Sequence, residues 1–194
     1  MKYLLLTAIA FLSYMVLPST ASAADESTEQ YAVYSTVIAR MFTAKDKSRQ
    51  LVIKDLTSTE DTVIDKLLQE SRYIARMFPT LQKGVLRDYK ARNKEPLQLK
   101  ESFALRIKYV LVADKEIDKL FNDKDGWWDE FYKRYPDSGG FISLSRPGFN
   151  AVMDQAFVYI EHYCGALCGT GHYVLLQKRK DRWKVVKQEM VWIS

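Results

Sequence analysis

The last third of the chain, from Phe141 onward, most constrains the fold because it is strongly β-forming. Four segments rich in β-branched and aromatic residues follow one another there, separated by turn signals: FISLS, QAFVYIEHYC, GHYVLLQKRK and RWKVVKQEMVWIS. Short strands joined by tight turns are typical of an antiparallel meander. The sequence therefore predicts a curved antiparallel sheet that is formed mainly by the C-terminal half of the chain.

The first half carries helical periodicity instead. In YAVYSTVIARMF the apolar residues recur at helical spacing, namely Tyr31, Tyr34, Ile38 and Met41. Ser58 followed by Asp61 resembles a capping box that opens a second helix, and LQKGVLRDYKARN predicts another. The segments QLVIKDLT and FALRIKYVLVAD are predicted as strands. Because helices come first and the meander last, we expect a single α+β domain over residues 24–194, with the helical half packed on the sheet.

The N-terminal stretch MKYLLLTAIAFLSYMVLPSTASA has the three parts of a secretory signal peptide. Lys2 supplies the positive charge, residues 3–17 are apolar, and Ala21-Ser22-Ala23 fits the cleavage rule. The apolar run is shorter than the ~20 residues of a membrane span and is interrupted by polar residues. Residues 1–23 are therefore predicted to be a signal peptide, and the mature protein is predicted to be periplasmic or secreted without a transmembrane segment.

The net charge is modest, at a formal value of +5. Basic residues alternate with acidic ones, as in KDKSRQLVIKD, which is typical of a solvated surface. We therefore expect no nucleic-acid partner. The cluster QKRKDRWK is the exception, and its position predicts the tip of a hairpin that could attract anionic glycans or headgroups of the cell envelope.

Both cysteines and both histidines of the chain lie in one short segment, HYCGALCGTGH. Two-residue periodicity places Cys164 opposite Cys168 if the flanking strands pair across a loop of residues 165–167. In this register Val158 faces Val174, so the apolar faces agree. Opposite residues of antiparallel strands are close enough for a disulfide, which an oxidising compartment favours. We therefore predict a disulfide that closes a small hairpin.

Two alternatives to this hairpin remain open. A longer loop that runs into Gly169-Thr170-Gly171 would shift the pairing, because Leu167 is a poor residue for the left-handed position of a three-residue loop. A tetrahedral metal site is the second alternative, although the spacing is not that of a zinc finger. Its ligands would be His162, Cys164, Cys168 and His172. We expect no cofactor.

The aromatic cluster of WWDEFYKRYP is the other notable feature. Trp128, Phe131, Tyr132 and Tyr135 fall on one helical face, and Trp127 precedes them. Stripes of this kind usually pack a helix onto its neighbours. A binding platform for carbohydrate or peptide is the alternative for these five residues.

Several motifs resemble a recurring group of exported bacterial proteins that is uncharacterised: YAVYSTVI, FYKRYPDSGGFISLSRPGFN and CGALCGTGHYVLL. The resemblance covers nearly all of the mature chain and implies a bacterial origin, but no activity. The last three strands are also similar to the sheet of nuclear-transport-factor-like and ketosteroid-isomerase-like α+β domains, in which a hairpin ending in an x-W-K-V strand is common. That similarity implies a fold and lends no catalytic residues.

Two functions are therefore considered. The favoured hypothesis is an exported, non-catalytic binding or envelope-accessory protein with a contact surface between the aromatic segment and the sheet. The alternative is a periplasmic enzyme, hydrolase-like or metal-dependent, with a site around Ser145, Asn150, His162 and His172. No nucleophile-elbow motif supports Ser145 as a nucleophile.

Overall fold

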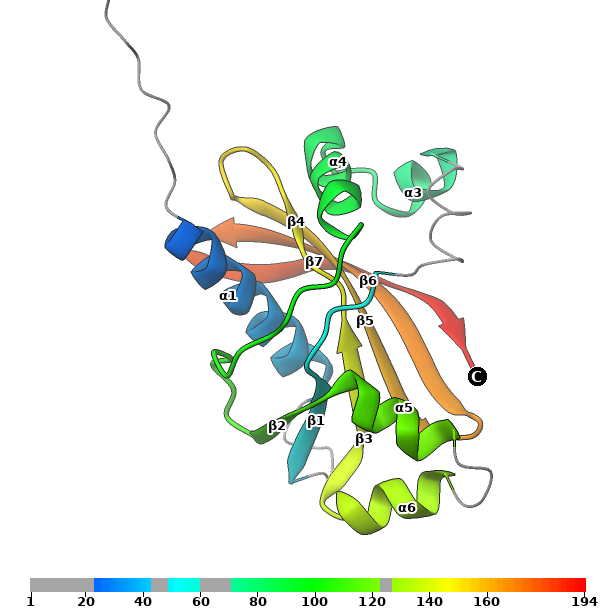
Figure 1. Cartoon of the computed structure of the whole chain (residues 1–194). Coiled ribbons are helices and arrows are strands. Elements are labelled where there is room, and N and C mark those ends of the chain that lie inside the picture. Colours follow the sequence, from blue (N-terminus) through cyan, green and yellow to red (C-terminus); the bar gives the residue numbers. More distant parts are fainter. Residues whose placement is uncertain (1–22, 43–48, 60–70, 123–126) are drawn as a thin grey trace, which may run out of the picture.

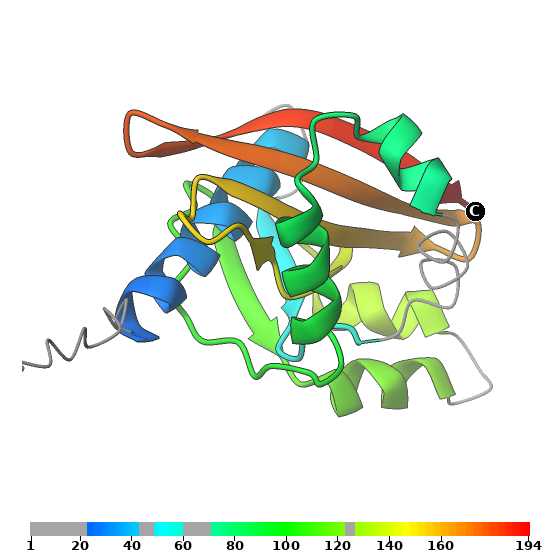
Figure 2. The same ribbon diagram turned by 90° about the horizontal axis from the view of Figure 1, so that it is seen from above.

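The computed structural model describes residues 23–42, 49–59, 71–122 and 127–194. In this part of the chain a curved, mixed sheet of seven strands carries helices on both faces (Figure 1, Figure 2). The α+β class is as predicted. The elements in chain order are α1 (Ala23–Met41), β1 (Gln50–Lys54), α3 (Ser71–Met77), α4 (Lys83–Arg92), β2 (Lys108–Val112), α5 (Asp114–Asn122), α6 (Trp127–Arg134), β3 (Ser138–Leu144), β4 (Gly148–Phe149), β5 (Gln155–Gly165), β6 (Cys168–Arg179) and β7 (Arg182–Ile193).

The strand order is β2-β1-β3-β5-β6-β7, and β4 pairs with β5 beside this path. The strands β3, β5, β6 and β7 form the predicted antiparallel meander. The sheet as a whole is mixed, because β1 pairs in parallel with both β2 and β3. Long connections separate β1 from both neighbours along the chain, and parallel strands require such crossovers.

The register predicted for the β5–β6 hairpin is confirmed over most of its length, because Val158 pairs with Val174. Near the tip, a bulge in β5 pairs Gly165 with Cys168. The predicted three-residue loop is therefore wrong, since the bulge shortens the turn to two residues. Leu167 accordingly has no positive φ, which removes the steric objection to this hairpin.

The next hairpin has its tip where the basic cluster predicted one. Lys180 and Asp181 connect β6 to β7, and their φ angles are 48° and 57°. Positive φ at both central residues is typical of the turn whose twist matches antiparallel strands.

The long predicted strand FALRIKYVLVAD is shorter in the structure, where β2 begins only at Lys108. Phe103 instead packs its ring against those of Tyr31 and Tyr34 of α1, at centroid distances of 5.1 and 5.8 Å. Burial against α1 thus replaces strand pairing in this segment. The predicted signal peptide and the helix opened by the Ser58–Asp61 box lie almost entirely outside the described residues.

Each face of the sheet has its own core. One face packs against α1 through residues that include Ile142, Val158, Ile160 and Val174. The opposite face packs against α3 and α4 through Phe157, Tyr159, Tyr173 and Leu175. At its other end this second face packs against α5 and α6 through Val52, Phe141 and Phe131. The two-residue period of the strands sorts these side chains between the faces.

Candidate ligand-binding pocket

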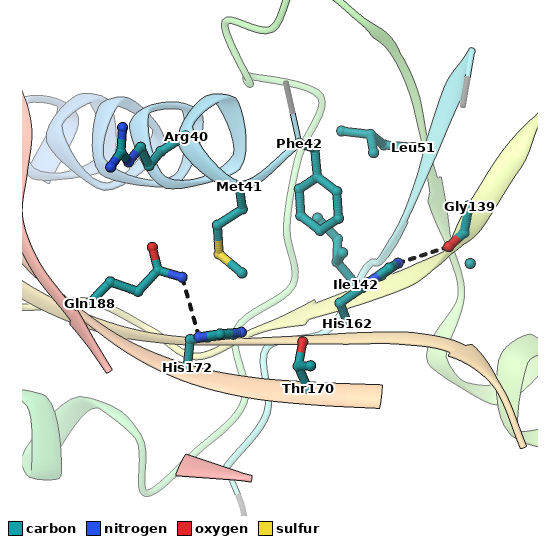
Figure 3. A pocket seen from close by; sticks show the side chains of 11 residues that line it. Arg40, Met41, Phe42, Leu51, Gly139, Ile142, His162, Thr170, His172 and Gln188 are labelled. Carbon is teal, nitrogen blue, oxygen red and sulfur yellow. Dashed lines mark hydrogen bonds between the residues drawn. The ribbon is translucent and has the colours of Figure 1, made fainter. Parts of the chain in front are cut away.

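A cavity of about 580 Å³ opens on the α1 face of the sheet, at the point where α1 ends. Ile160 of β5 is fully buried beneath the helix. Two-residue alternation places His162 on the same face, beyond the end of the helix. His172 of β6 pairs with Ile160, so it lies on this face as well. Both histidines therefore reach the cavity (Figure 3).

The lining combines apolar and polar groups from separate parts of the chain. The apolar side chains are Met41, Phe42, Leu51 and Ile142, and the polar ones are Arg40, His162, Thr170, His172 and Gln188. Gly139 and Gly140 of β3 complete the wall. None of the described residues that line the cavity is an aspartate or a glutamate. The pocket therefore has a basic character with an apolar wall.

His172 projects from β6 beneath Met41 and is oriented by a neighbouring strand (Figure 3). The side-chain amide nitrogen of Gln188 lies 3.2 Å from Nδ1 of His172. An amide nitrogen can only donate, so Nδ1 accepts and the proton of the neutral ring sits on Nε2. Burial, and secondly the charge of His162, lowers the pKa of His172 below its usual range. The ring is therefore neutral at pH 7.

His162 is held on two sides. Its Nε2 lies 2.8 Å from the carbonyl oxygen of Gly139, so Nε2 donates to that oxygen. Its ring also packs edge-on against Phe42, with centroids 5.0 Å apart and planes at 80°. These contacts connect β5 with β3 and with the end of α1, and they give the cavity a preformed wall.

The proposed enzyme residues do not converge in this pocket. The structure brings His162 and His172 together, whereas Ser145 and Asn150 lie outside the cavity. Ser145 is buried, and its hydroxyl accepts a hydrogen bond of 2.8 Å from the backbone N–H of Tyr159. Asn150 organises the turn before β5, where its side chain contacts Asp154. Both side chains therefore have structural partners and no imidazole beside them.

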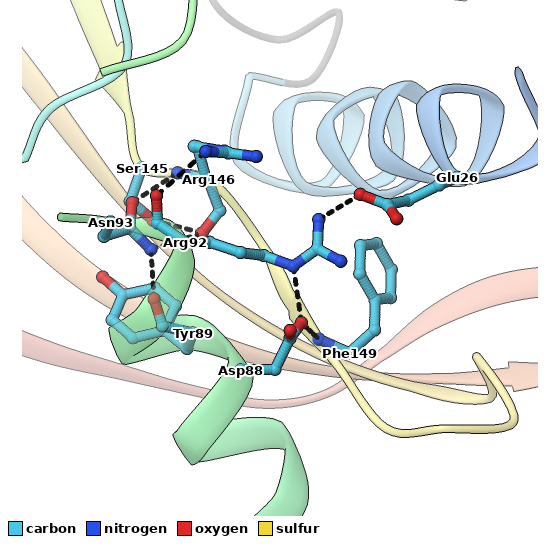
Figure 4. A network of polar contacts seen from close by, with 8 residues as sticks. All are labelled: Glu26, Asp88, Tyr89, Arg92, Asn93, Ser145, Arg146 and Phe149. Atoms are coloured by element: carbon cyan, nitrogen blue, oxygen red, sulfur yellow. Dashed lines mark hydrogen bonds and ion pairs between the residues drawn. The ribbon is translucent and has the colours of Figure 1, made fainter. Parts of the chain in front are cut away.

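Ser145 adjoins a polar network of residues from α1, α4 and the β3–β4 loop (Figure 4). Arg92 of α4 pairs with Asp88 at 2.6 Å and with Glu26 of α1. The hydrogen bond from Arg92 lowers the pKa of Glu26. The amide of Asn93 exchanges hydrogen bonds of 2.8 Å with the backbone of Arg146. These contacts connect α1, α4 and the β3–β4 loop.

The two cysteines lie at the tip of the β5–β6 hairpin, whose strands also carry the two histidines. Their sulfur atoms are within bonding distance and their Cα atoms are 5.0 Å apart, as a disulfide requires. The alternative ligand set of His162, Cys164, Cys168 and His172 is not assembled, since each imidazole and each sulfur has another neighbour. Across the described ranges, no three His, Cys, Asp or Glu side chains are grouped as a metal site.

We expect mass spectrometry of the denatured, alkylated protein to show no modified cysteine and a mass lower by two hydrogen atoms than that of the reduced chain. The double variant Cys164→Ser/Cys168→Ser should lower the free energy of unfolding by only about 2 kcal/mol, because the closed loop is short. Urea denaturation of both proteins measures this difference. Two alkylated thiols in protein purified without reductant would contradict the prediction.

The aromatic segment packs into the core, as its periodicity indicates. Phe131 is fully buried. Trp128 stacks on Phe141 of β3, with ring centroids 5.9 Å apart. The hydroxyl of Tyr132 donates to the carbonyl oxygen of Cys164, and burial together with a hydrogen bond to Glu116 raises the pKa of Tyr135 to about 12. The side chain of Trp127 lies outside the described part of the chain. A binding role for this segment stays a prediction.

Comparisons of the chain with protein-family models, with curated proteins and with solved structures find no match. The resemblances based on the sequence motifs therefore stay predictions. None of the helices in the described residues is long and apolar enough to span a membrane. The function must consequently be argued from the pocket itself.

Proposed function

We propose that the protein is an exported, non-catalytic binding protein whose ligand occupies the pocket between His162 and His172. The observation that carries this proposal is the cavity of about 580 Å³, preformed at the end of α1. Sites for small molecules occupy about 300–1,000 Å³ and combine apolar walls with a few oriented polar groups. Export is supported by the signal-like residues 1–23 and by the cysteine pair.

The positions of the polar groups favour binding over catalysis. A hydrolase would need a nucleophile within hydrogen-bond reach of its base. Ser145, the candidate nucleophile, is hydrogen-bonded within the β3–β5 region and does not line the cavity. The two imidazoles are instead oriented by Gly139 and Gln188 as fixed hydrogen-bonding groups.

The proposal is tested by filling the cavity. Thr170 is half-buried on the pocket floor, so Thr170→Trp should occupy the space without disturbing the opposite core. Val152 is 73 % exposed on a turn, and Val152→Trp serves as the matched control. We expect native mass spectrometry of protein from the periplasm to detect a bound small molecule on the wild type and on Val152→Trp, but not on Thr170→Trp. A wild type without bound mass, or equal occupancy of Thr170→Trp, would contradict the proposal.

A further inference from the structure

We infer that the pocket takes an anion with an apolar body, of which a medium-chain carboxylic acid is the simplest example. This inference rests on the proposed binding function and adds the chemical class of the ligand. It follows from three properties of the described residues: the charge of the lining, the direction of its hydrogen-bond donors, and two exposed apolar side chains beside the cavity on the edge strand β7.

The charge of the lining favours an anion. Arg40 carries a permanent positive charge at the rim of the cavity, above Gln188 (Figure 3). It is exposed, and none of the ion pairs among the described residues involves it. By contrast, Arg92 is paired with two carboxylates. Since the lining residues that the structure describes include no acidic side chain, an ammonium ligand would be repelled by Arg40, whereas a carboxylate would pair with it.

The hydrogen-bond donors of the floor suit the same ligand. Because Gln188 occupies Nδ1 of His172, the proton on Nε2 is presented to the cavity. Thr170 lies on the neighbouring position of the same face and adds a hydroxyl. Carboxylate oxygens only accept hydrogen bonds, and they accept them more strongly than a neutral hydroxyl does. These donors therefore distinguish an acid from the corresponding alcohol.

The apolar part of the site extends beyond the cavity. Met190 and Ile193 of β7 are the strand partners of His172 and Thr170, and therefore lie on the same face. They are 51 % and 69 % exposed. Single exposed apolar side chains are ordinary, whereas neighbouring ones beside a pocket add to its apolar surface. They adjoin the floor of the cavity at His172 and Thr170, so an aliphatic chain whose head contacts His172 can lie against them.

The inference is tested with three probes of equal chain length: octanoate, octanol and octylammonium. Isothermal titration calorimetry at pH 7 and low salt measures their dissociation constants for the full mature protein. We expect octanoate to bind about tenfold more tightly than octanol, as hydrogen bonds to a charged group are stronger than neutral ones. Octylammonium should bind most weakly.

Two variants test which residues cause the preference for octanoate over octanol. Arg40→Gln and His172→Leu should each weaken octanoate binding severalfold and leave octanol binding unchanged within twofold. Arg87→Gln is the matched control, because Arg87 is exposed on α4 and lines a different cavity. It should change neither affinity.

The outcomes separate this inference from the proposed function. Equal affinities for octanoate and octanol, or tightest binding of octylammonium, would overturn the inference while leaving a ligand pocket in place. Failure of all three probes to bind would also overturn it. The bound mass on wild type and its loss from Thr170→Trp decide the proposed function independently of these probes.

Discussion

Replacing Gly140 with alanine is expected to lower the free energy of unfolding by about 3–5 kcal/mol, through backbone strain and overpacking together. Gly140 has a φ of +107°, a conformation that side-chain-bearing residues rarely adopt. An added Cβ would also overlap the carbonyl oxygen of Tyr163 and lie 2.8 Å from Cα of Cys164. Both are backbone atoms of β5, so relief requires β3 and β5 to separate, which would open one wall of the pocket.

The matched control is Gly84→Ala in α4. No atom lies within 4 Å of the Cβ that this substitution adds. Alanine at an exposed helical position is expected to stabilise the protein by roughly 0.5–1 kcal/mol relative to glycine. Urea denaturation of the wild type and both variants provides the comparison. A Gly140→Ala variant as stable as the wild type would show that β3 does not approach β5 this closely.

Phe131→Ala is expected to cost about 3–5 kcal/mol of stability, the range for removing a buried phenylalanine. Its side chain is fully buried, and the rings of Trp128, Tyr135 and Phe141 lie 5.4, 5.2 and 5.7 Å from its own. The cavity left by truncation would thus lie between α6 and β3. A residue of an exposed binding platform would contribute little to the free energy of unfolding, so the size of the loss distinguishes packing from recognition.

Tyr73→Ala provides the control for this measurement. Tyr73 is the exposed aromatic residue of α3, at 37 % exposure. Its truncation is expected to change the free energy of unfolding by less than about 1 kcal/mol. Guanidinium denaturation followed by far-ultraviolet circular dichroism gives both values on the same scale. Equal, small losses for the two variants would contradict a core role for Phe131.

Local pattern was sufficient for the C-terminal strands and for one part of the site. Two-residue alternation predicted β5, β6 and the pairing of Val158 with Val174, because the register of a half-buried hairpin is constrained by which side chains must be buried. The same alternation put His162 on the apolar face. It also puts His172 there through the paired strand, although the sequence did not predict a pocket over that face.

The bulge and the parallel strand could not be found in this way. The irregularity before Gly165 moves one residue of β5 out of the pairing. Leu167 counted against a three-residue loop, but no local pattern predicted a bulge in its place. The position of β1 beside β3 depends on long connections, for which sequence periodicity carries no information. The sequence also does not reveal that the hydroxyl of Ser145 accepts a hydrogen bond from the backbone of Tyr159, which gives this side chain a structural role.

The sequence by itself determined the α+β class, the hairpins, the helical face of α1 and the shared face of the two histidines, because these depend on the periods of helices and strands. Only the tertiary structure decided that α1 ends over that face and leaves a cavity there. Arg40, Gly139 and Gln188 come from α1, β3 and β7, and they line one cavity with the two histidines only after the sheet has assembled. Contacts between such distant segments arise from tertiary packing, and the periodicity of the sequence within one helix or strand does not encode them.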